Sequence, residues 1–430
     1  MSDTMIYGRE ETKQRLRRNV ITPGEDAGAA SPAPAGAPGV PEGGKDELRE
    51  RKRRKWKRRL GLFAVVFLLL LLGVLAVRYY RRSHFYSSYT TVWEKEIPST
   101  EGGYAGYEKF GSNVLKYTRD GASYIDGHGK IVWSASYEMK NPVVSVNGDY
   151  AAIGDRQGTG IYIFNLSGSL GQATADLPIV NVSVSAYGVV AAQEEDSTAS
   201  YILFYNKDGT ALDVKIKLVM SQSGYILDSS LSPDGTQLML SDVYVSEGTL
   251  GNRISFYNFS DYGMSYPDRL VAGFEEFGTS LAPRVKFLSD RRAVAFAAGK
   301  VAFYSLENVT SPEMLQMVSL DEEMKAVAYS ENAVAVVTDD SSGEAPFRLH
   351  IYNTDGKETA NTGVDYSWQD ISIDDDFVIF RNDDSCRIYG TDGKERFDGR
   401  FDFPASKIVK KNYHTLLVSG GGTIREIRLK

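Results

Sequence analysis

Cysteine is almost absent from this 430-residue chain, in which Cys386 is the only one. An intramolecular disulfide is therefore excluded, and because large secreted eukaryotic domains often carry disulfides, the composition favours a bacterial envelope. Histidine is nearly as scarce, and His84, His128, His350 and His414 do not stand at metal-ligand spacing. We expect such single histidines to be structural. The sequence also lacks a Gly-x-Ser-x-Gly elbow, a phosphate-binding loop and a His-Glu-x-x-His motif, so it indicates no catalytic residue, cofactor or metal site.

One long apolar run, Leu60–Val77, divides the chain. Its 18 residues contain no charge and no proline, and at about 1.5 Å of helical rise each they cross most of a hydrocarbon core of roughly 30 Å. Nine basic residues lie within 49–59 and three within 78–82, and this asymmetry predicts a cytoplasmic N-terminus. The 59 residues before the run and the bulky residues after it argue against a cleaved signal peptide. We therefore predict a single-pass plasma-membrane protein with an extracytoplasmic C-terminal domain.

Charge differs sharply across this run. Residues 1–82 contain 18 basic and 9 acidic residues, a net charge of +9, whereas residues 83–430 contain 31 and 47, a net charge of −16. An acidic outer domain argues against nucleic-acid binding, which needs a basic surface. The basic block reads more simply as a topology determinant that also attracts anionic lipid headgroups.

The segment before the basic block is rich in Pro, Ala and Gly over residues 22–44 and cannot bury enough surface to offset its ordering entropy. The sequence thus predicts four parts: a disordered cytoplasmic tail at 1–48, a basic juxtamembrane block at 49–59, a transmembrane signal-anchor helix at 60–80 and an extracytoplasmic domain at 83–430.

The outer domain consists of repeats. A short strand with aromatic or β-branched residues, usually followed by a turn, recurs every 37 to 52 residues. The copies begin at Ser123, Ile161, Ile202, Ile254, Val301, Leu349, Cys386 and Thr423. This spacing is typical of a four-stranded propeller blade.

A more apolar strand pair precedes each copy, and together they define eight units. The units begin near Tyr107, Pro142, Pro178, Tyr225, Ala282, Met324, Trp368 and Ala405. The sequence therefore predicts an all-β fold, a β-propeller of eight blades, with seven blades as the alternative if one unit is misread. The last unit supplies three strands, and the strand Tyr89–Ile97 has no blade of its own. Pairing the two would close the ring and remove two sheet edges.

Asp-Gly pairs end several of the repeated strands. Gly accepts the left-handed backbone that a hairpin turn demands. The clear cases are Asp126-Gly127, Asp208-Gly209, Asp355-Gly356 and Asp392-Gly393. We expect these residues to be structural.

Two stretches resemble known repeats. Residues 126–133 read DGHGKIVW and resemble the quinoprotein-type repeat, which implies a turn at Gly129 and a docking role between blades for Trp133. Ser232, Pro233, Asp234 and Gly235 are similar to the turn of WD-like and Tol-Pal-type repeats. As a whole, the chain resembles a domain-of-unknown-function family of bacterial proteins with a cytoplasmic tail, one membrane helix and an external propeller. The resemblance covers residues 83–430.

Two polar or aromatic patterns have weaker functional interpretations. Acidic clusters at 339–340, 374–376 and 383–384 could supply oxygens to Ca²⁺, but they lack the regular Asp-x-Asp-x-Asp-Gly spacing, which favours solvated turns. Trp93, Trp133 and Trp368 could stack on sugar rings, although their strand positions favour packing.

These observations favour a non-catalytic scaffold, tethered to the lipid bilayer by a single span, that binds a protein or cell-wall partner through one propeller face. An extracytoplasmic enzyme, quinoprotein-like or glycan-active, is the alternative. The best candidates for recognition loops are Val243–Asn252 and Thr338–Phe347, which are rich in Ser, Gly, Asp and Glu.

Overall fold

The computed structural model describes residues 43–97 and 105–430. The chain separates into two compact units, Met1–Val74 and Leu75–Lys430. Most of the predicted tail, residues 1–42, lies outside the described residues.

The long helix α2 spans Gly43–Ser83. Within it, Arg59–Tyr80 is 22 residues long and apolar enough to cross a membrane, and its side chains are not buried inside the protein. The predicted tail extended to residue 48, whereas α2 begins at Gly43. Leu, Lys, Glu and Arg dominate the sequence from Lys45 onwards, and all four favour helix.

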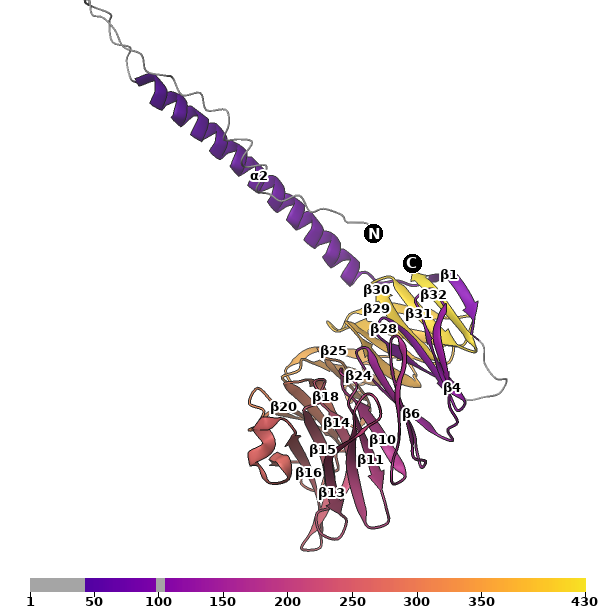
Figure 1. Cartoon of the computed structure of the whole chain (residues 1–430). Coiled ribbons are helices and arrows are strands. Elements are labelled where there is room, and N and C mark those ends of the chain that lie inside the picture. The colour runs from indigo at the N-terminus through magenta and orange to yellow at the C-terminus, as the bar shows by residue number, and fades with distance from the viewer. Residues whose placement is uncertain (1–42, 98–104) are drawn as a thin grey trace, which may run out of the picture. The chain divides into compact units, whose positions relative to one another are not determined.

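Eight four-stranded antiparallel sheets form the blades of a propeller (Figure 1). Blade 1 consists of β2 (Ala105–Phe110), β3 (Asn113–Thr118), β4 (Gly121–Ile125) and β5 (Ile131–Ser136); blade 2 of β6 (Pro142–Asn147), β7 (Tyr150–Asp155), β8 (Gly160–Asn165) and β9 (Gly168–Thr174); blade 3 of β10 (Ile179–Val184), β11 (Val190–Glu195), β12 (Ala199–Tyr205) and β13 (Ala211–Val219); blade 4 of β14 (Tyr225–Leu231), β15 (Gln237–Ser246), β16 (Thr249–Asn258) and β17 (Leu270–Phe274).

The remaining blades follow the same order. Blade 5 consists of β18 (Arg284–Ser289), β19 (Arg292–Ala297), β20 (Lys300–Ser305) and β21 (Glu313–Ser319); blade 6 of β22 (Met324–Tyr329), β23 (Val334–Asp339), β24 (Phe347–Tyr352) and β25 (Glu358–Val364); blade 7 of β26 (Asp370–Asp374), β27 (Phe377–Arg381), β28 (Ser385–Gly390) and β29 (Glu395–Arg400); blade 8 of β30 (Lys407–Asn412), β31 (Thr415–Gly420), β32 (Thr423–Leu429) and β1 (Tyr89–Glu96). Two short 3-10 helices, η1 (Asp261–Ser265) and η2 (Pro267–Arg269), lie between β16 and β17.

The eight-blade prediction is confirmed, and seven blades are excluded. The predicted closure is also confirmed, because β1 pairs with β32 from Tyr89↔Leu429 to Glu96↔Thr423. Two further backbone bonds fasten the chain before β1, from Lys430 N to Ser88 O and from Ser88 N to Lys430 O. The ring therefore closes by joining the first strand to the C-terminal strand in one sheet.

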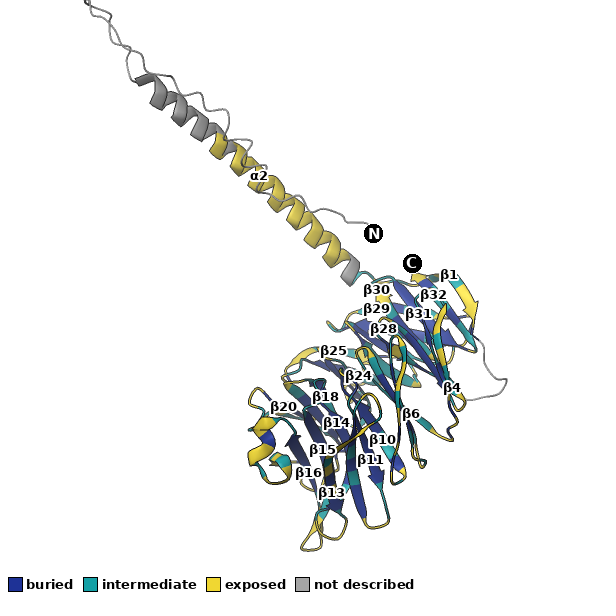
Figure 2. Ribbon diagram, viewed as in Figure 1, coloured by how far each residue is buried: buried dark blue, intermediate teal, exposed yellow. Residues whose placement is uncertain are grey.

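The core lies between neighbouring blades (Figure 2), and in six of the eight blades the second strand has the largest buried fraction. In β31, for example, all six residues are buried. Small and β-branched residues fill these strands because both faces are covered, which explains their nearly continuous apolar sequence.

Serine side chains join the first strands of successive blades around the ring axis. Ser145 Oγ accepts a hydrogen bond from the N–H of Val184 at 3.1 Å. Ser183 Oγ accepts one from Leu231 at 3.1 Å, and Ser230 Oγ accepts one from Phe287 at 3.0 Å. Each hydroxyl thus satisfies a backbone donor of the next blade, which would otherwise be buried without a partner.

Candidate functional site

The ring has two chemically different faces. The connections between second and third strands, and those from one blade to the next, leave the sheets at the same end; we call this end the loop face. The connections between first and second and between third and fourth strands form the turn face. Because Tyr89 pairs with the end of β32, β1 starts at the turn face, and the chain enters the ring there.

The loop face is strongly acidic. Its described connections contain sixteen acidic and three basic residues, against thirteen and six in those of the turn face. The acidic ones are Asp120, Glu138, Asp176, Asp196, Glu247, Glu275, Glu276, Asp321, Glu322, Glu323, Asp340, Glu344, Asp365, Asp383, Asp384 and Asp402; the basic ones are Arg119, Lys140 and Arg156. This face therefore presents a negative potential to a partner.

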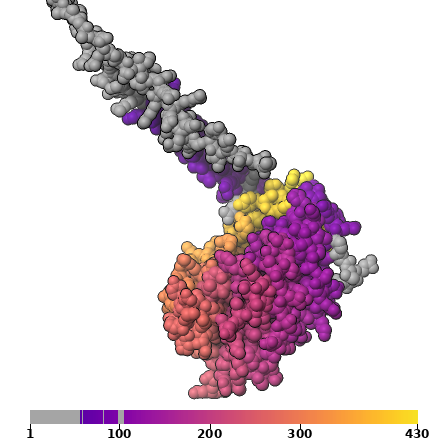
Figure 3. Space-filling view, in the orientation of Figure 1, coloured from indigo at the N-terminus to yellow at the C-terminus, as the bar shows by residue number. Residues whose placement is uncertain are grey.

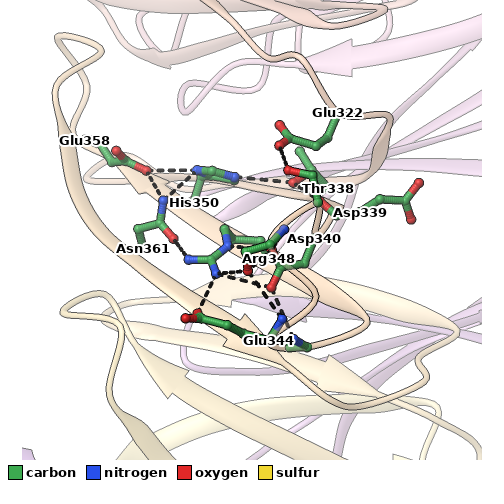
Figure 4. Close-up of polar contacts among 12 residues, drawn as sticks. Glu322, Thr338, Asp339, Asp340, Glu344, Arg348, His350, Glu358 and Asn361 are labelled. Atoms are coloured by element: carbon green, nitrogen blue, oxygen red, sulfur yellow. Dashed lines mark hydrogen bonds and ion pairs between the residues drawn. The ribbon is translucent and has the colours of Figure 1, made fainter.

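The predicted recognition loop Thr338–Phe347 lies on the loop face as the connection between β23 and β24 (Figure 4). Hydrogen bonds within the loop and ion pairs with Arg348 fix its conformation. Asp340 receives hydrogen bonds from the backbone N–H of Ser342 and Ala345, and Arg348 Nε lies 3.1 Å from its Oδ1. The bond from Arg348 is the main reason that the pKa of Asp340 is held well below its usual range. Arg348 also pairs with Glu344 at 2.9 Å, so the loop is ordered by charge-assisted bonds.

A hydroxyl, an imidazole and a carboxylate meet beside this loop. His350 Nε2 lies 3.3 Å from Thr338 Oγ1, and His350 Nδ1 lies 2.8 Å from Glu358 Oε1 (Figure 4). Thr338 is fully buried, however, and its hydroxyl donates to the carbonyl oxygen of Asp339 at 2.9 Å. The hydroxyl proton is therefore not shared with the imidazole, and a substrate has no access to the oxygen. We read the arrangement as structural; sequence spacing could not reveal it, because it depends on cross-strand register.

The prediction that Val243–Asn252 is a loop is wrong. β15 and β16 continue through it in register as far as Ser246↔Thr249, and the turn consists of Glu247 and Gly248. Both turn residues have positive φ, 51° and 80°, the conformation of a two-residue hairpin that follows the natural strand twist. In Figure 3 this hairpin belongs to the protrusion at the lower edge.

The predicted repeat residues lie in turns of the turn face. The turn from Asp126 to Lys130 is closed by bonds from Asp126 N to Lys130 O and from Gly129 N to Asp126 O. The left-handed residue is Gly129, with φ 73°, so the assignment of that role to Gly127 is wrong. The same turn recurs with Gly209, Gly356 and Gly393 in the left-handed position, each preceded by the predicted aspartate: Asp208, Asp355 and Asp392.

The Ser232–Gly235 turn joins β14 to β15. Gly235 has φ 76° and donates its N–H to the carbonyl of Ser232, while Asp234 Oδ1 accepts bonds from Ser232 Oγ at 2.6 Å and from Thr236 N at 2.9 Å. Pro233 offers its carbonyl to Ala186 N of the preceding blade at 2.7 Å. The motif thus links blade 4 to blade 3 by a backbone hydrogen bond, and its role is structural.

Trp133 lies on β5 and packs against the next blade. Its ring stacks on that of Phe164 with centroids 5.2 Å apart and an interplanar angle of 10°, and its Nε1–H donates to Leu166 O at 3.2 Å. The side chain is half-buried between blades 1 and 2.

The three acidic clusters are bound to basic side chains or to the backbone. Asp374 accepts the N–H of Lys410 at 2.6 Å, and Lys410 Nζ pairs with Asp375 and Asp376. Asp384 pairs with Arg400 at 2.7 Å in a shallow depression of about 430 Å³. Within residues 43–97 and 105–430, the structure shows no group of three His, Cys, Asp or Glu side chains arranged to hold a metal ion.

Solved structures share the fold at low sequence identity. BamB from Moraxella catarrhalis matches with a TM-score of 0.50 and 12% identity over 79% of this chain and 100% of that chain. Chaetomium thermophilum Sqt1, in complex with the N-terminus of ribosomal protein L10, gives 0.47 and 11% over 80% and 96%. The Pan2 WD40 domain of Neurospora crassa gives 0.43 and 8% over 80% and 97%. A search of curated proteins finds no match.

The match to BamB supports the β-propeller fold and shows nothing about activity. A family model supplies the membership: residues 80–429 match the family of unknown function DUF5711, and the chain therefore belongs to that family.

Proposed function

We propose that this protein is a membrane-anchored, non-catalytic scaffold whose propeller binds a protein partner through the loop face. The observation that carries the proposal is the contrast between the two faces. The turn face repeats one short turn in four blades and receives the incoming chain, whereas the loop face combines connections of fixed conformation with a larger excess of acidic residues, sixteen against three basic ones.

The anchor follows from α2. The side chains of Leu62, Phe63 and Leu70 are 65–70% exposed, and the other large apolar side chains between Leu60 and Val77 are 45–61% exposed. A lipid environment makes such a surface favourable. The basic block before it favours a cytoplasmic N-terminus and an extracytoplasmic propeller.

The absence of catalysis is supported by how the polar groups are used. The hydroxyl beside His350 is buried and bonded to the backbone, and the Asp374–Asp376 cluster is bonded to Lys410. These polar groups are thus engaged in holding blades and loops together.

The topology leaves the loop face available. Residues 86–88 are hydrogen-bonded beside the C-terminus at the turn face, from Tyr86 N to Arg396 O and from Ser87 N to Lys430 O. The chain therefore enters the propeller at the face opposite to the proposed binding face.

Site-specific photo-crosslinking in intact cells tests the proposal. A photoreactive residue is placed at three exposed loop-face positions (Gln222, Thr279 and Ser341) and, as controls, at three exposed turn-face positions (Tyr187, Tyr262 and Asn308). Specific protein adducts from the loop face alone support a scaffold that works through this face. Adducts only from the turn face, or from neither face, contradict it.

Two further measurements decide the anchor and the alternative function. Protease added to protoplasts should digest the propeller and spare the N-terminal tail; protection of the propeller would contradict the proposed topology. A visible-absorbing cofactor in the purified full chain, or EDTA-sensitive hydrolysis of a cell-wall glycan, would favour the enzyme.

A further inference from the structure

The hairpin of blade 4 extends beyond the strands on both sides of it. β14 pairs with β15 only as far as Tyr225↔Val243, and β17 pairs with β16 only as far as Phe274↔Ile254. Residues 244–251 therefore pair only with one another; we call them the finger. Three residues on each strand extend it by about 10 Å at roughly 3.3 Å per residue.

Polar contacts on both sides of the hairpin fix the base of the finger. The guanidinium of Arg253 lies 5.3 Å from the centroid of the Tyr244 ring and pairs with Asp242 at 2.8 Å. Asn252 Nδ2 donates to Ser241 Oγ at 3.0 Å and to the carbonyl of Asp242 at 2.9 Å. These contacts hold the hairpin in one conformation before any partner arrives, which lowers the entropy cost of binding.

Beyond this base, the side of the finger opposite to Tyr244 presents an apolar pair to solvent. Val245 and Leu250 are direct cross-strand partners, and they are 68% and 43% exposed. Side chains facing each other on neighbouring strands lie about 5 Å apart, so the two form one continuous patch. Because the fold gains little from a patch in water, its presence on a rigid hairpin indicates a docking surface.

Acidic side chains lie at the tip of the finger and beside its base. Glu247 occupies the tip, and Glu275 and Glu276 begin the connection that follows blade 4, which meets the base through the bond from Asn252 N to Gly278 O at 2.9 Å. Among the described residues these three carboxylates form no ion pair, although Glu275 is hydrogen-bonded to the Tyr244 hydroxyl, whereas Glu344 and Asp384 on the same face are paired with arginines. Their charge is therefore available to a basic group of a partner.

We propose that the finger docks a segment of a partner protein in which apolar side chains are flanked by lysine or arginine. The apolar residues cover Val245 and Leu250, and the basic residues meet Glu247 and the two glutamates after β17. The inference rests on the proposed scaffold function and specifies both its binding site and the chemistry of its partner.

Charge excludes two other occupants. A second copy of this chain would bring two acidic loop faces together, and like charges in contact are costly. A bilayer with anionic headgroups repels the same carboxylates. A basic polypeptide is the occupant that the observed charge and the apolar pair both favour.

Selection of peptides on the full chain tests the proposal. The probe is a phage-displayed library of random 16-residue peptides, selected on the protein in phosphatidylcholine nanodiscs. We expect enriched peptides to carry a net positive charge around two or more apolar residues. Their binding should weaken at least tenfold in the V245S/L250S double variant and should weaken as salt is raised from 50 to 500 mM.

The matched control is Y262S/M264S on the turn face, whose target residues are 70% and 65% exposed and lie within the η1 helix. It should leave binding unchanged, and both variants should melt like the natural protein because their target side chains are exposed. The conservative V245I/L250M variant should retain binding. Peptides that are neutral or acidic, or whose binding is indifferent to V245S/L250S, would overturn the assignment to the finger.

The two proposals can fail separately. Peptides that crosslink to Thr279 or Ser341 but ignore the finger variant would leave the scaffold function standing and refute the finger. If selection yields no peptide for the loop face and photo-crosslinking also gives no adduct there, both are refuted.

Discussion

Replacing Trp133 with alanine should destabilise the propeller by about 2–4 kcal/mol. The indole stacks on Phe164 with centroids 5.2 Å apart, an arrangement worth roughly 0.5–1.5 kcal/mol beyond burial. Its hydrogen bond to Leu166 O adds about 0.5–1.5 kcal/mol. Burial of a whole large apolar side chain contributes roughly 1.5–3 kcal/mol, and the half-buried indole about half of that.

The measurable consequence is a lower melting temperature. With an unfolding entropy of about 2.1 cal/mol/K per residue over the propeller, this loss corresponds to a decrease of roughly 3–6 °C in Tm. The assay is thermal unfolding of the full chain in detergent, followed by tryptophan fluorescence and by calorimetry. W133F should lower Tm less than W133A does, because it loses the hydrogen bond but retains the ring stacking.

A double-mutant cycle separates stacking from general packing. W133A and F164L should show a coupling energy of about 0.5–1.5 kcal/mol if the two rings interact directly. A Tm within 1 °C of the natural protein, or a cycle without coupling, would refute the view that Trp133 joins blades 1 and 2. Normal melting combined with lost peptide binding would instead make Trp133 part of a ligand site.

Three further predictions address the ring and its buried groups. Replacing residues 89–96 with an eight-residue Gly-Ser linker keeps the chain connected but opens the ring, so calorimetry should show loss of the cooperative transition; an unchanged transition would mean that another contact closes the ring. S183A leaves the N–H of Leu231 without its acceptor and should lower the free energy of unfolding by about 1–3 kcal/mol, whereas the exposed control S134A should lower it by less than about 0.5 kcal/mol. Equal effects of the two variants would show that the serine bonds between blades contribute nothing particular to stability. Burial raises the pKa of Glu194, so folding takes up a proton between the ordinary carboxyl pKa of about 4.3 and the higher folded value. The free energy of unfolding should therefore decrease as pH rises through this interval, and E194Q should remove that dependence. An identical pH profile of stability for E194Q would refute this prediction.

The architecture could be predicted because each blade carries its own local signals. Apolar second strands, aromatic third strands and glycine turns recur at blade spacing, and the predicted unit starts lie within two residues of the observed first strands. Closure was predictable for a similar reason, since a strand without a blade and a blade without a fourth strand leave two edges that must pair.

The errors have a common cause: amino-acid composition does not determine which residues of neighbouring strands pair with each other. The segment Val243–Asn252 reads as a loop because Ser, Glu, Gly and Thr are frequent in it, yet cross-strand pairing continues to Ser246. The turn at Asp126 offers two glycines, and only its hydrogen bonds show that Gly129 rather than Gly127 is left-handed. The contact between Thr338 and His350 likewise depends on which residues of β23 and β24 face each other.

The distribution of charge over the ring supports the assignment of function to one face. Connection length does not distinguish the faces, because second-to-third connections on the loop face vary from two residues in blade 5 to seven in blade 6, and third-to-fourth connections on the turn face vary from two in blade 2 to eleven in blade 4. Four of these turn-face connections share one hydrogen-bond pattern and a left-handed glycine, at Gly129, Gly209, Gly356 and Gly393. The described connections of the loop face contain sixteen acidic and three basic residues, and the chain enters the ring at the opposite face. The larger excess of negative charge and the exposed pair Val245 and Leu250 therefore lie at the end of the ring that is away from the entry of the chain.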